Sequence, residues 1–420
     1  MHIIMKGVCV RMLNIMSQKT LSLQTAKSEG RFARKQAAQP QVAWLFPSLW
    51  LGHYWHPIFV AIENLHSNTR VFAGGLWDDF DTEAPGTRLV EQVGSTKYHR
   101  YAQTDGYSKQ VIMPSFSIIP KLLAQRPKVV YTQAFSLWSL LVVLFKGIGG
   151  WQVNMFIDGS SPNVDFRDSR LRTFMRRFIV RFTDLFVPNS EAARDYLVDF
   201  LGADPDKVVI NRYLMPDAEY LHQNVNAAVD LPQDKINFLY VGKLIPRKGA
   251  ERLIKACVAL KERGFDNFNL VMVGDGSQRQ ALEEMVSAAD LQDQVSWRGW
   301  VTPDELGPYY KAADVFVFPT LEDIWGIVAL EAMAFGCPVI GSSYAGSSEM
   351  IEDGESGFIV DPNDDDAFVN AMQRFVAEPE LVERMGKEAQ AVTLKHTPQA
   401  AAAAFYELVN VQLTTKQQSA

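Results

Sequence analysis

Short apolar runs alternate with helix-patterned stretches along the chain from Gln41 onward. The runs are rich in Val, Ile, Phe and Tyr, which favours strands that are covered on both faces of a sheet. The predicted strands are 42–46, 70–74, 128–132, 153–158 and 185–190 in the first half, and 236–242, 269–276, 295–300, 315–320, 337–343 and 357–360 in the second. Strands that alternate with helices predict an α/β protein with parallel sheets.

Apolar residues at helical spacing mark several segments between these runs. They predict helices over 303–312 and 366–377, and a terminal helix over the Ala-rich 401–413. The most apolar helical stretch, 137–145, is interrupted by Ser139 and is far shorter than the roughly 20 apolar residues of a membrane-spanning helix. We therefore expect 137–145 to be a buried helix.

The pattern also predicts where the domains begin and end. Residues 216–235 show no strong period and contain a Pro near each end, which is typical of a linker. Two Rossmann-like domains are expected, over 39–215 and 236–398, with a terminal helix and tail over 399–420. Residues 1–38 are expected to be a disordered extension, because Lys6 and Arg11 split their apolar residues and no signal-cleavage pattern follows. Two such domains that face each other would place the ligand site in the cleft between them, at the carboxyl ends of the strands.

Composition and charge narrow the functional classes. The chain has 420 residues and a net charge of −7, so it lacks the basic footprint of a general nucleic-acid binder, although a local basic patch remains compatible with these values. Its three cysteines, Cys9, Cys257 and Cys337, are widely spaced and form no metal or redox pattern. This cysteine usage favours a reducing cytoplasm.

The segment 320–336, TLEDIWGIVALEAMAFG, carries the first candidate chemistry. It predicts a turn after a strand and then a helix that ends at Gly336. The start of a helix exposes unpaired N–H groups that hold a phosphate well, and Gly326 would let the backbone approach a ligand closely. In the alternative interpretation, Asp323 only caps the helix and Glu331 is a surface residue.

This segment resembles the donor-binding signature of the family 4 glycosyltransferases, which are group 1 glycosyltransferases of the GT-B fold. In that signature two glutamates separated by seven residues flank a Phe/Trp-Gly pair, and Asp323 and Glu331 are the aligned positions here. The resemblance implies that Glu331 binds the ribose of the nucleotide and that Asp323 faces the transferred sugar. Glu322 is the alternative first acid, but its spacing is one residue too long. Four further donor contacts are implied at Ile324, Trp325, Gly326 and Ile327.

The segment 240–249, YVGKLIPRKG, resembles a second motif of this family, a Gly-Arg-x(4)-Lys-Gly turn that holds the pyrophosphate of the donor. The matching positions are Gly242, Lys243, which replaces the usual arginine, and Lys248. Two fixed cations beside a leaving diphosphate would stabilise the charge that grows as the glycosidic bond breaks. In the alternative interpretation they are solvated lysines of an exposed loop.

Three further matches in the second half are weaker. Gly274 and Gly276 lack the third glycine of a dinucleotide fingerprint and predict a strand-to-helix turn. The segment 298–306, RGWVTPDEL, resembles the turn that contacts the base, which implies Trp300 and Val301. Glu349, in a Gly-x-x-Glu turn, is interpreted as structural.

In the first half the turn over 46–59 is the expected acceptor site. Family members often carry two glycines here, near the donor phosphate, and this chain has Gly52. The residues that follow, His53, Tyr54, Trp55 and His56, suit stacking on sugar rings, but core packing is an equal alternative for the Tyr-Trp pair. Asp158, at a strand end, could orient the acceptor or stabilise an oxocarbenium-like centre; the alternative is a turn or cap residue.

The segment 167–182 has six arginines against one aspartate, interleaved with apolar residues at helical spacing. Such a basic amphipathic helix can lie on an anionic membrane surface, or it can be a solvated helix packed on its own domain. The following helix is predicted to begin at a Ser190 cap.

The resemblance implies a retaining, metal-independent glycosyltransferase of polysaccharide biosynthesis. It would move a sugar from a nucleotide-sugar donor, which is a co-substrate rather than a cofactor, to a glycan or lipid-linked saccharide. We expect it in the cytoplasm, with peripheral contact to the inner face of the membrane as an option. The alternatives are a nucleotide-sugar epimerase or phosphorylase of the same fold, and a catalytically degenerate relative that only binds.

Overall fold

The structure is a computed structural model. It describes residues 41–50, 52–66, 68–77, 80–102, 109–223, 225 and 228–418. The expected N-terminal extension, 1–38, lies outside the described residues.

The described chain divides into two compact units. Unit 1 comprises the described residues of 41–102, 109–214 and 398–418, and unit 2 those of 215–397. The expected linker is not extended throughout, because it contains helix α10 (Ala218–Gln223). In unit 2, the His222 ring of α10 bonds the carbonyl oxygen of Ala334 through Nε2 at 2.9 Å.

Unit 1 is built on a parallel sheet with the strand order β3-β2-β1-β6-β7-β8. The strands are β1 Val42–Phe46, β2 Thr69–Ala73, β3 Val90–Gln92, β6 Val129–Gln133, β7 Gln152–Ile157 and β8 Leu185–Pro188. All five predicted strands are present. The pattern missed β3 and an antiparallel hairpin, β4 (Lys97–Ala102) with β5 (Lys109–Met113).

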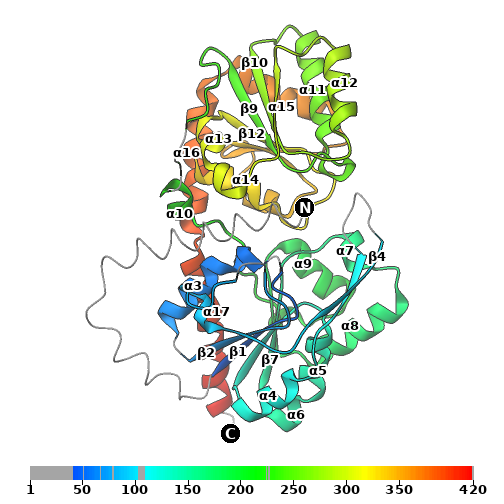
Figure 1. Cartoon of the computed structure of the whole chain (residues 1–420), viewed down its shortest axis with the longest axis vertical. Helices are drawn as coiled ribbons and strands as arrows, with labels where there is room; N and C mark the ends of the chain where they lie inside the picture. The colour runs from blue at the N-terminus through cyan, green and yellow to red at the C-terminus, as the bar shows by residue number, and fades with distance from the viewer. Residues whose placement is uncertain are drawn as a thin grey trace, which may run out of the picture. The chain divides into compact units, whose positions relative to one another are not determined.

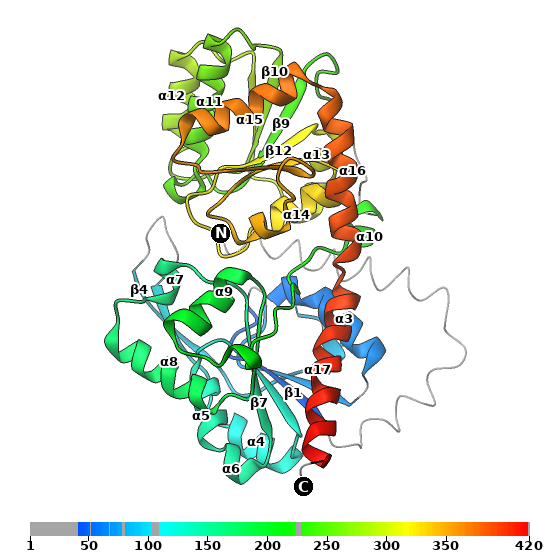
Figure 2. The ribbon, with the colours of Figure 1, turned by 180° about the vertical axis from the view of Figure 1, so that it is seen from behind.

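Helices cover this sheet on both faces (Figures 1 and 2). They are α3 His56–Leu65, α4 Ile118–Gln125, α5 Leu137–Leu144, α6 Lys146–Gly149, α7 Pro162–Asp165, α8 Arg170–Phe182 and α9 Glu191–Asp195. Ser190 caps α9, as predicted, by accepting a hydrogen bond from the Ala193 amide at 3.2 Å. Ser139, which interrupts the apolar run of α5, forms a capping box with Ser136.

The C-terminal helix α17 (Pro398–Gln418) belongs to unit 1. It lies along α3 in both ribbon views. Phe405 packs edge-on against Trp44 of β1, with the ring centroids 4.8 Å apart, and its carbonyl accepts the Tyr131 hydroxyl at 3.0 Å. The chain therefore returns at its end to complete the core of the first unit.

Unit 2 repeats the arrangement with the parallel strand order β11-β10-β9-β12-β13-β14. Its strands are β9 Ile236–Val241, β10 Phe268–Val273, β11 Val295–Gly299, β12 Val315–Phe318, β13 Val339–Ser342 and β14 Gly357–Val360. All six were predicted, with ends that shift by a few residues. Both units thus have the Rossmann order 3-2-1-4-5-6, in which ligands bind beyond the carboxyl ends of the strands.

The helices of unit 2 are α11 Ala250–Glu262, α12 Arg279–Ala288, α13 Gly307–Ala312, α14 Ile327–Ala334, α15 Asp365–Ala377 and α16 Glu380–Lys395. The single helix predicted over 303–312 is split into a 3-10 turn, Pro303–Glu305, and α13. Pro308 stands in the first turn of α13, where the missing N–H of proline costs nothing.

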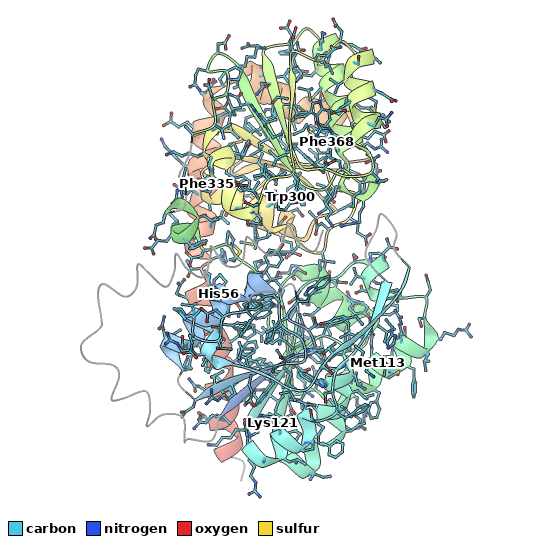
Figure 3. All side chains as sticks on the ribbon, viewed as in Figure 1. His56, Met113, Lys121, Trp300, Phe335 and Phe368 are labelled. Atoms are coloured by element: carbon cyan, nitrogen blue, oxygen red, sulfur yellow. The ribbon has the colours of Figure 1, made fainter. Side chains whose placement is uncertain are left out.

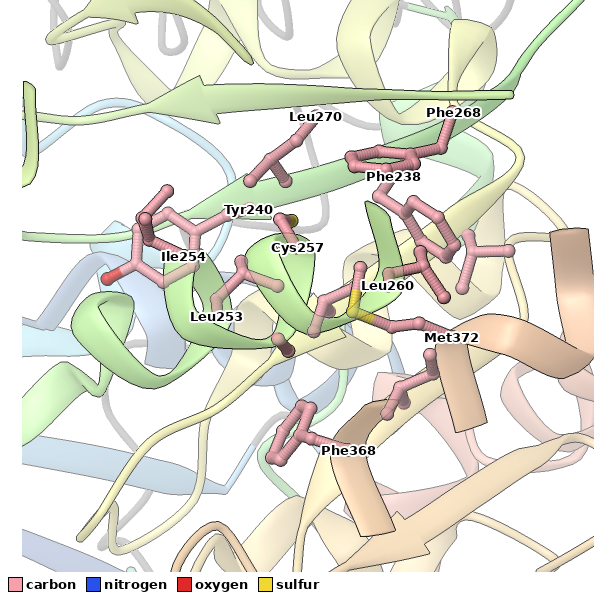
Figure 4. Packing of buried hydrophobic residues seen from close by; sticks show 14 of the residues in the cluster. Phe238, Tyr240, Leu253, Ile254, Cys257, Leu260, Phe268, Leu270, Phe368 and Met372 are labelled. Atoms are coloured by element: carbon pink, nitrogen blue, oxygen red, sulfur yellow. The ribbon is translucent and has the colours of Figure 1, made fainter. Parts of the chain in front are cut away.

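The core of unit 2 lies between its sheet and helices α11 and α15 (Figure 4). Phe238 and Leu270 come from the sheet, Cys257 from α11, and Phe368 from α15, and the last two helices pack on each other. Cys257 and Cys337 are both buried free thiols. This core fixes the sheet whose edge carries the candidate site.

Candidate functional site

Three loops of unit 2 leave the carboxyl ends of β9, β12 and β13, which are neighbours in the sheet. They span 242–249, 319–326 and 343–349. Because the strands are parallel and adjacent, the loops emerge at one edge of the sheet. The two motifs of the sequence, 240–249 and 320–336, are therefore brought together there.

Backbone hydrogen bonds join the first loop to the second. The Arg247 carbonyl accepts the Leu321 amide at 2.8 Å and the Thr320 hydroxyl at 3.1 Å. The Arg247 guanidinium donates to the Glu322 carbonyl at 2.6 Å. Sequence reasoning missed Arg247, although it stands beside Lys248 in the PRKG motif. It ties the two loops to each other through both its backbone and its side chain.

The second and third loops are joined in the same way. Asp323 and Ala345 form a parallel β-bridge, with the Asp323 amide donating to the Tyr344 carbonyl at 3.1 Å. A Cβ atom at Gly346 would lie 2.3 Å from the Ile324 carbonyl oxygen, so only glycine allows this approach. The Gly-x-x-Glu turn, which includes the half-buried Glu349, thus holds the backbone of the acid motif, in line with its structural interpretation.

Lys248 and Asp323 form an ion pair across the first two loops. Both side chains are largely buried, at 17% and 12% exposure, and the Lys248 ammonium lies 5.4 Å from the centre of the Phe318 ring. Asp323 does not cap α14, because the residue at that position is Gly326. The structure therefore pairs one cation and one acid that the sequence had placed in separate motifs.

Helix α14 begins without a side-chain cap. Gly326 has φ +97°, in the left-handed region, and a Cβ atom there would lie 2.4 Å from the Phe318 ring. Trp325 is buried, whereas Ile324 and Ile327 are half-buried. The first amides of an α-helix have no partner within the helix, so the start of α14 can donate hydrogen bonds to an anion.

Glu331 lies on α14 and is half-buried. Its Oε2 accepts the Tyr310 hydroxyl of α13 at 2.8 Å. Loss of water around this carboxyl raises its pKa, and the hydrogen bond from Tyr310 opposes that rise. Glu331 is thus held by the protein rather than freely solvated. Tyr310 was not identified from the sequence, because its relation to Glu331 depends on how α13 packs on α14.

Glu331→Gln is expected to be more stable than the parent at neutral pH. A carboxyl whose pKa rises on folding binds more protons in the folded chain than in the unfolded chain. The parent therefore loses stability as the pH rises from 4.5, the ordinary pKa of this carboxyl, through its raised pKa in the folded chain. Glutamine can still accept from Tyr310 but does not titrate. Chemical denaturation across this pH range checks the result, with the exposed Glu355→Gln as control. A gain independent of pH would contradict the proposed cause.

The remaining predicted donor residues lie around the same sheet edge. Lys243 is exposed, and its carbonyl accepts the Tyr240 hydroxyl at 3.0 Å. Gly274 has φ +137°, and a Cβ atom there would lie 1.8 Å from the Gly242 carbonyl oxygen. The predicted turn after β10 therefore packs directly on the Gly242 loop. Trp300, which Figure 3 labels, follows β11 and is exposed, and Val301 beside it is half-buried.

In unit 1, both carboxylate oxygens of Asp158 are bound. Oδ1 accepts the Tyr213 hydroxyl at 2.9 Å and Oδ2 accepts the Gln133 side-chain amide at 3.0 Å. Burial raises the pKa of Asp158, and both hydrogen bonds oppose that rise. The cap alternative does not describe these contacts, because both partners are side chains from other elements. Asp158 is a held carboxyl at the end of β7.

The predicted acceptor turn is largely packed into unit 1. Gly52 is buried, and a Cβ atom there would lie 2.8 Å from Leu49. Trp55 is buried, with its ring centroid 4.8 Å from those of Phe156 and Tyr213, so the core-packing alternative describes it.

The other acceptor candidates are less uniform. His56, which Figure 3 labels, bonds the Pro85 carbonyl oxygen through Nε2 at 3.0 Å, and burial lowers the pKa of its ring. Tyr54 is exposed. The side chain of His53 lies outside the described residues. Among the predicted acceptor residues whose side chains are described, Tyr54 thus offers an accessible ring.

Two general features concern the described residues only. They contain no group of three or more His, Cys, Asp or Glu side chains placed to hold a metal ion. None of their helices is both long enough and apolar enough to cross a bilayer.

Residues 223–392, which include all three loops, match the family described as glycosyl transferases group 1. We call these matched residues the group 1 segment. The group 1 segment thus contains the Lys248–Asp323 pair, the start of α14 and Glu331. Unit 1 lies entirely outside it.

Curated proteins similar to this chain are named glycosyltransferases. A D-inositol 3-phosphate glycosyltransferase of Streptomyces griseus is 30% identical over 238 residues, which are 51% of this chain and 50% of that protein. An alpha-D-kanosaminyltransferase of Streptomyces kanamyceticus is 33% identical over 156 residues, 37% of this chain and 40% of that protein. The chain thus spans about half the length, or less, of these relatives.

Solved structures show the fold. The alignment with Anabaena Alr3699/HepE in complex with UDP covers 88% of this chain and 100% of that protein's chain, with a TM-score of 0.69 and 16% identity. The alignment with a sucrose-phosphate synthase from Thermosynechococcus elongatus covers 89% of this chain and 100% of that protein's chain, with a TM-score of 0.64 and 21% identity. The predicted class, α/β of the GT-B type with two Rossmann-like units, is confirmed.

Proposed function

We propose that the protein is a glycosyltransferase that uses a nucleotide-sugar donor. The observation that carries this proposal is the set of groups gathered at one edge of the group 1 segment: Lys248 with Asp323, the uncapped start of α14, and Glu331. A cation and the amides at the start of a helix suit a diphosphate, and a held carboxylate suits a pair of hydroxyls. Donor binding is accordingly assigned to unit 2.

Lys243, Lys248 and the amides from Ile324 to Ile327 would hold the diphosphate. Lys248 is paired with Asp323. A bound phosphate would share its ammonium, which frees Asp323 to accept hydrogen bonds from the transferred sugar. The cations would then stabilise the diphosphate as its charge grows on departure, the stage at which fixed charges accelerate a reaction most.

Glu331 would accept hydrogen bonds from the ribose hydroxyls, while Tyr310 keeps its carboxylate in position. Trp300 and Val301 would contact the base. UDP is the first nucleotide to test, because the Anabaena protein similar in fold was solved with UDP.

The acceptor is assigned to unit 1, as a glycan or lipid-linked saccharide. Tyr54 would offer an aromatic face and Asp158 would orient the reacting hydroxyl or stabilise positive charge at the sugar. We further propose family 4 membership, transfer with retention of configuration, independence of metal ions, a role in polysaccharide biosynthesis, and a cytoplasmic site of action. A lipid-linked acceptor would also require contact with a membrane surface.

Thermal unfolding with UDP, GDP, ADP and dTDP, and with their common sugars, tests the donor site. A ligand that binds only the folded state adds about 2.7 kcal/mol of stability at a hundred times its dissociation constant. We expect the nucleotides of one base to stabilise the parent and Glu355→Ala equally. Their affinity for Glu331→Ala should be about ten-fold or more lower, since a hydrogen bond to a charged group contributes about 1.5–3 kcal/mol. No shift with any base would contradict the donor assignment.

Product analysis then separates transfer from the alternatives. A transferase yields a new glycoside only with an acceptor present. Conversion of the nucleotide sugar without acceptor would indicate an epimerase, and dependence on inorganic phosphate a phosphorylase. Binding without turnover across donors and acceptors would indicate a degenerate relative.

A further inference from the structure

Helix α8 carries a stripe of large apolar side chains on its outer face. Leu171 and Phe174 are 70% and 71% exposed. Met175, Phe178 and Phe182 are also exposed. Figures 1 and 2 show α8 at the outside of unit 1, beside α5. We call these five residues, together with Arg170, Arg177 and Arg181, the α8 surface.

The stripe follows from the period of the helix. Positions 171, 174, 178 and 182 are spaced by three or four residues, so they share one face. The opposite face is anchored in the core through Ile179 and Val180, which are buried. The helix is therefore held by one apolar face while a second apolar face stays accessible, which folding alone does not require.

Arginines border the stripe on one side. Arg170, Arg177 and Arg181 follow the spacing i, i+7, i+11 and are exposed. Among the described ion pairs none involves these three, although Arg177 donates to the Phe200 carbonyl at 2.9 Å. By contrast, Arg167 and Arg176 are engaged with Asp165 nearer the core. The border thus presents three positive charges next to apolar side chains.

We propose that the α8 surface docks on an anionic lipid membrane, with α8 lying in the plane of the interface. The five apolar side chains would enter the boundary between headgroups and acyl chains, and the three arginines would contact lipid phosphates. Amphipathic helices with a basic border bind membranes through this combination. The chain as a whole is acidic, with a net charge of −7, so the attraction must come from this local group. The inference concerns an interaction surface and goes beyond the proposed transfer reaction.

Charge argues against self-association through the same surface. Two copies that faced each other here would bring Arg170, Arg177 and Arg181 of each close to those of the other, and like charges across an interface are unfavourable. An anionic bilayer complements them instead.

Sedimentation with vesicles tests the proposal on the full chain, without donor or acceptor. We expect binding to vesicles of phosphatidylcholine with phosphatidylglycerol and little binding to phosphatidylcholine alone. Binding should weaken as salt is raised, because the Debye length falls from about 10 Å at 0.1 M to about 3 Å at 1 M. The readout is independent of donor binding, so failure here is distinct from failure of the proposed function.

Two sets of variants separate the apolar and charged parts. Leu171→Ser with Phe174→Ser should weaken binding at least about ten-fold, and its control, Leu65→Ser with Leu394→Ser, removes two exposed apolar side chains elsewhere. The charged part is tested by the triple variant Arg170→Gln, Arg177→Gln, Arg181→Gln. It should weaken vesicle binding about a hundred-fold, since each charge contributes a factor of about five. Lys207→Gln, Arg384→Gln and Lys395→Gln remove the same charge from exposed positions elsewhere.

Three outcomes would overturn the proposal. They are the absence of parent binding to anionic vesicles, equal losses in the α8 variants and their controls, and a dimer in solution that only the Leu171→Ser, Phe174→Ser variant abolishes. The last would assign the surface to a second copy of the chain.

Discussion

Lys248→Ala is expected to lower the rate of sugar transfer at saturating donor by about 10²–10³-fold. This is the usual cost of removing one positioned group that stabilises charge in a transition state. Lys248 is the more enclosed of the two predicted cations and is already held in place by Asp323. Steady-state kinetics with the donor identified by thermal unfolding provide the measurement, and Lys255→Ala, on the exposed face of α11, is the matched control.

Removing Lys248 also leaves Asp323 without its cation, so a second variant is needed. In Lys248→Ala with Asp323→Ala, no carboxylate is stranded in the largely buried pair. Asp323→Ala alone is the reference, because Asp323 is itself assigned to the transferred sugar. If the loss came only from the stranded carboxylate, the double variant would transfer sugar as fast as Asp323→Ala. If Lys248 binds the diphosphate, stability recovers and transfer falls well below that of Asp323→Ala. A Lys248→Ala enzyme with an unchanged kcat would refute its assigned role.

Gly249→Ala is expected to lower the free energy of unfolding of unit 2 by about 3 kcal/mol or more. Gly249 has φ +70°, and a Cβ atom there would lie 1.9 Å from the Pro319 carbonyl oxygen. The left-handed conformation costs a non-glycine residue about 1–2 kcal/mol, and overpacking against backbone adds about 1–3 kcal/mol. Urea denaturation measures the loss, with the transitions of the two units fitted separately.

Gly354→Ala is the matched control for this prediction. Gly354 has φ +79°, but nothing lies within 4 Å of its Cβ position. It should therefore lose only the conformational cost, about 1–2 kcal/mol. Equal losses in the two variants would show that the approach of the first loop to Pro319 is not what requires glycine.

The central strands of both sheets were predictable because each is a short apolar run between turn residues. Strand β3 is the three-residue segment VEQ, and β4 and β5 are KYHRYA and KQVIM. Their polar residues give no alternating pattern, because these strands lie at a sheet edge or outside the main sheets. Pairing with neighbours distant in sequence, rather than local hydrophobicity, makes them strands.

The place of the C-terminal helix was decided by tertiary structure. An Ala-rich amphipathic stretch predicts α17, but it does not indicate which core receives it. Contacts of Phe405 with Trp44 and Tyr131, both far away in the sequence, assign it to unit 1. The role of Trp55 was also decided by tertiary structure. An aromatic residue at the start of a helix can stack on a sugar or pack in a core, and only the packing of Trp55 on Phe156 shows that it belongs to the core.

By itself the sequence determined the fold class, most strands of two Rossmann-like sheets and the two motifs that carry the candidate chemistry. Local periodicity and short motif spacings are enough for this, since both depend on neighbouring residues. The partners of those motifs were decided only by the tertiary structure. Lys248 meets Asp323 because β9 and β12 are adjacent in the sheet, and Glu331 meets Tyr310 because α13 packs on α14. Such pairs depend on strand order and helix packing, which bring together residues that are far apart in the chain.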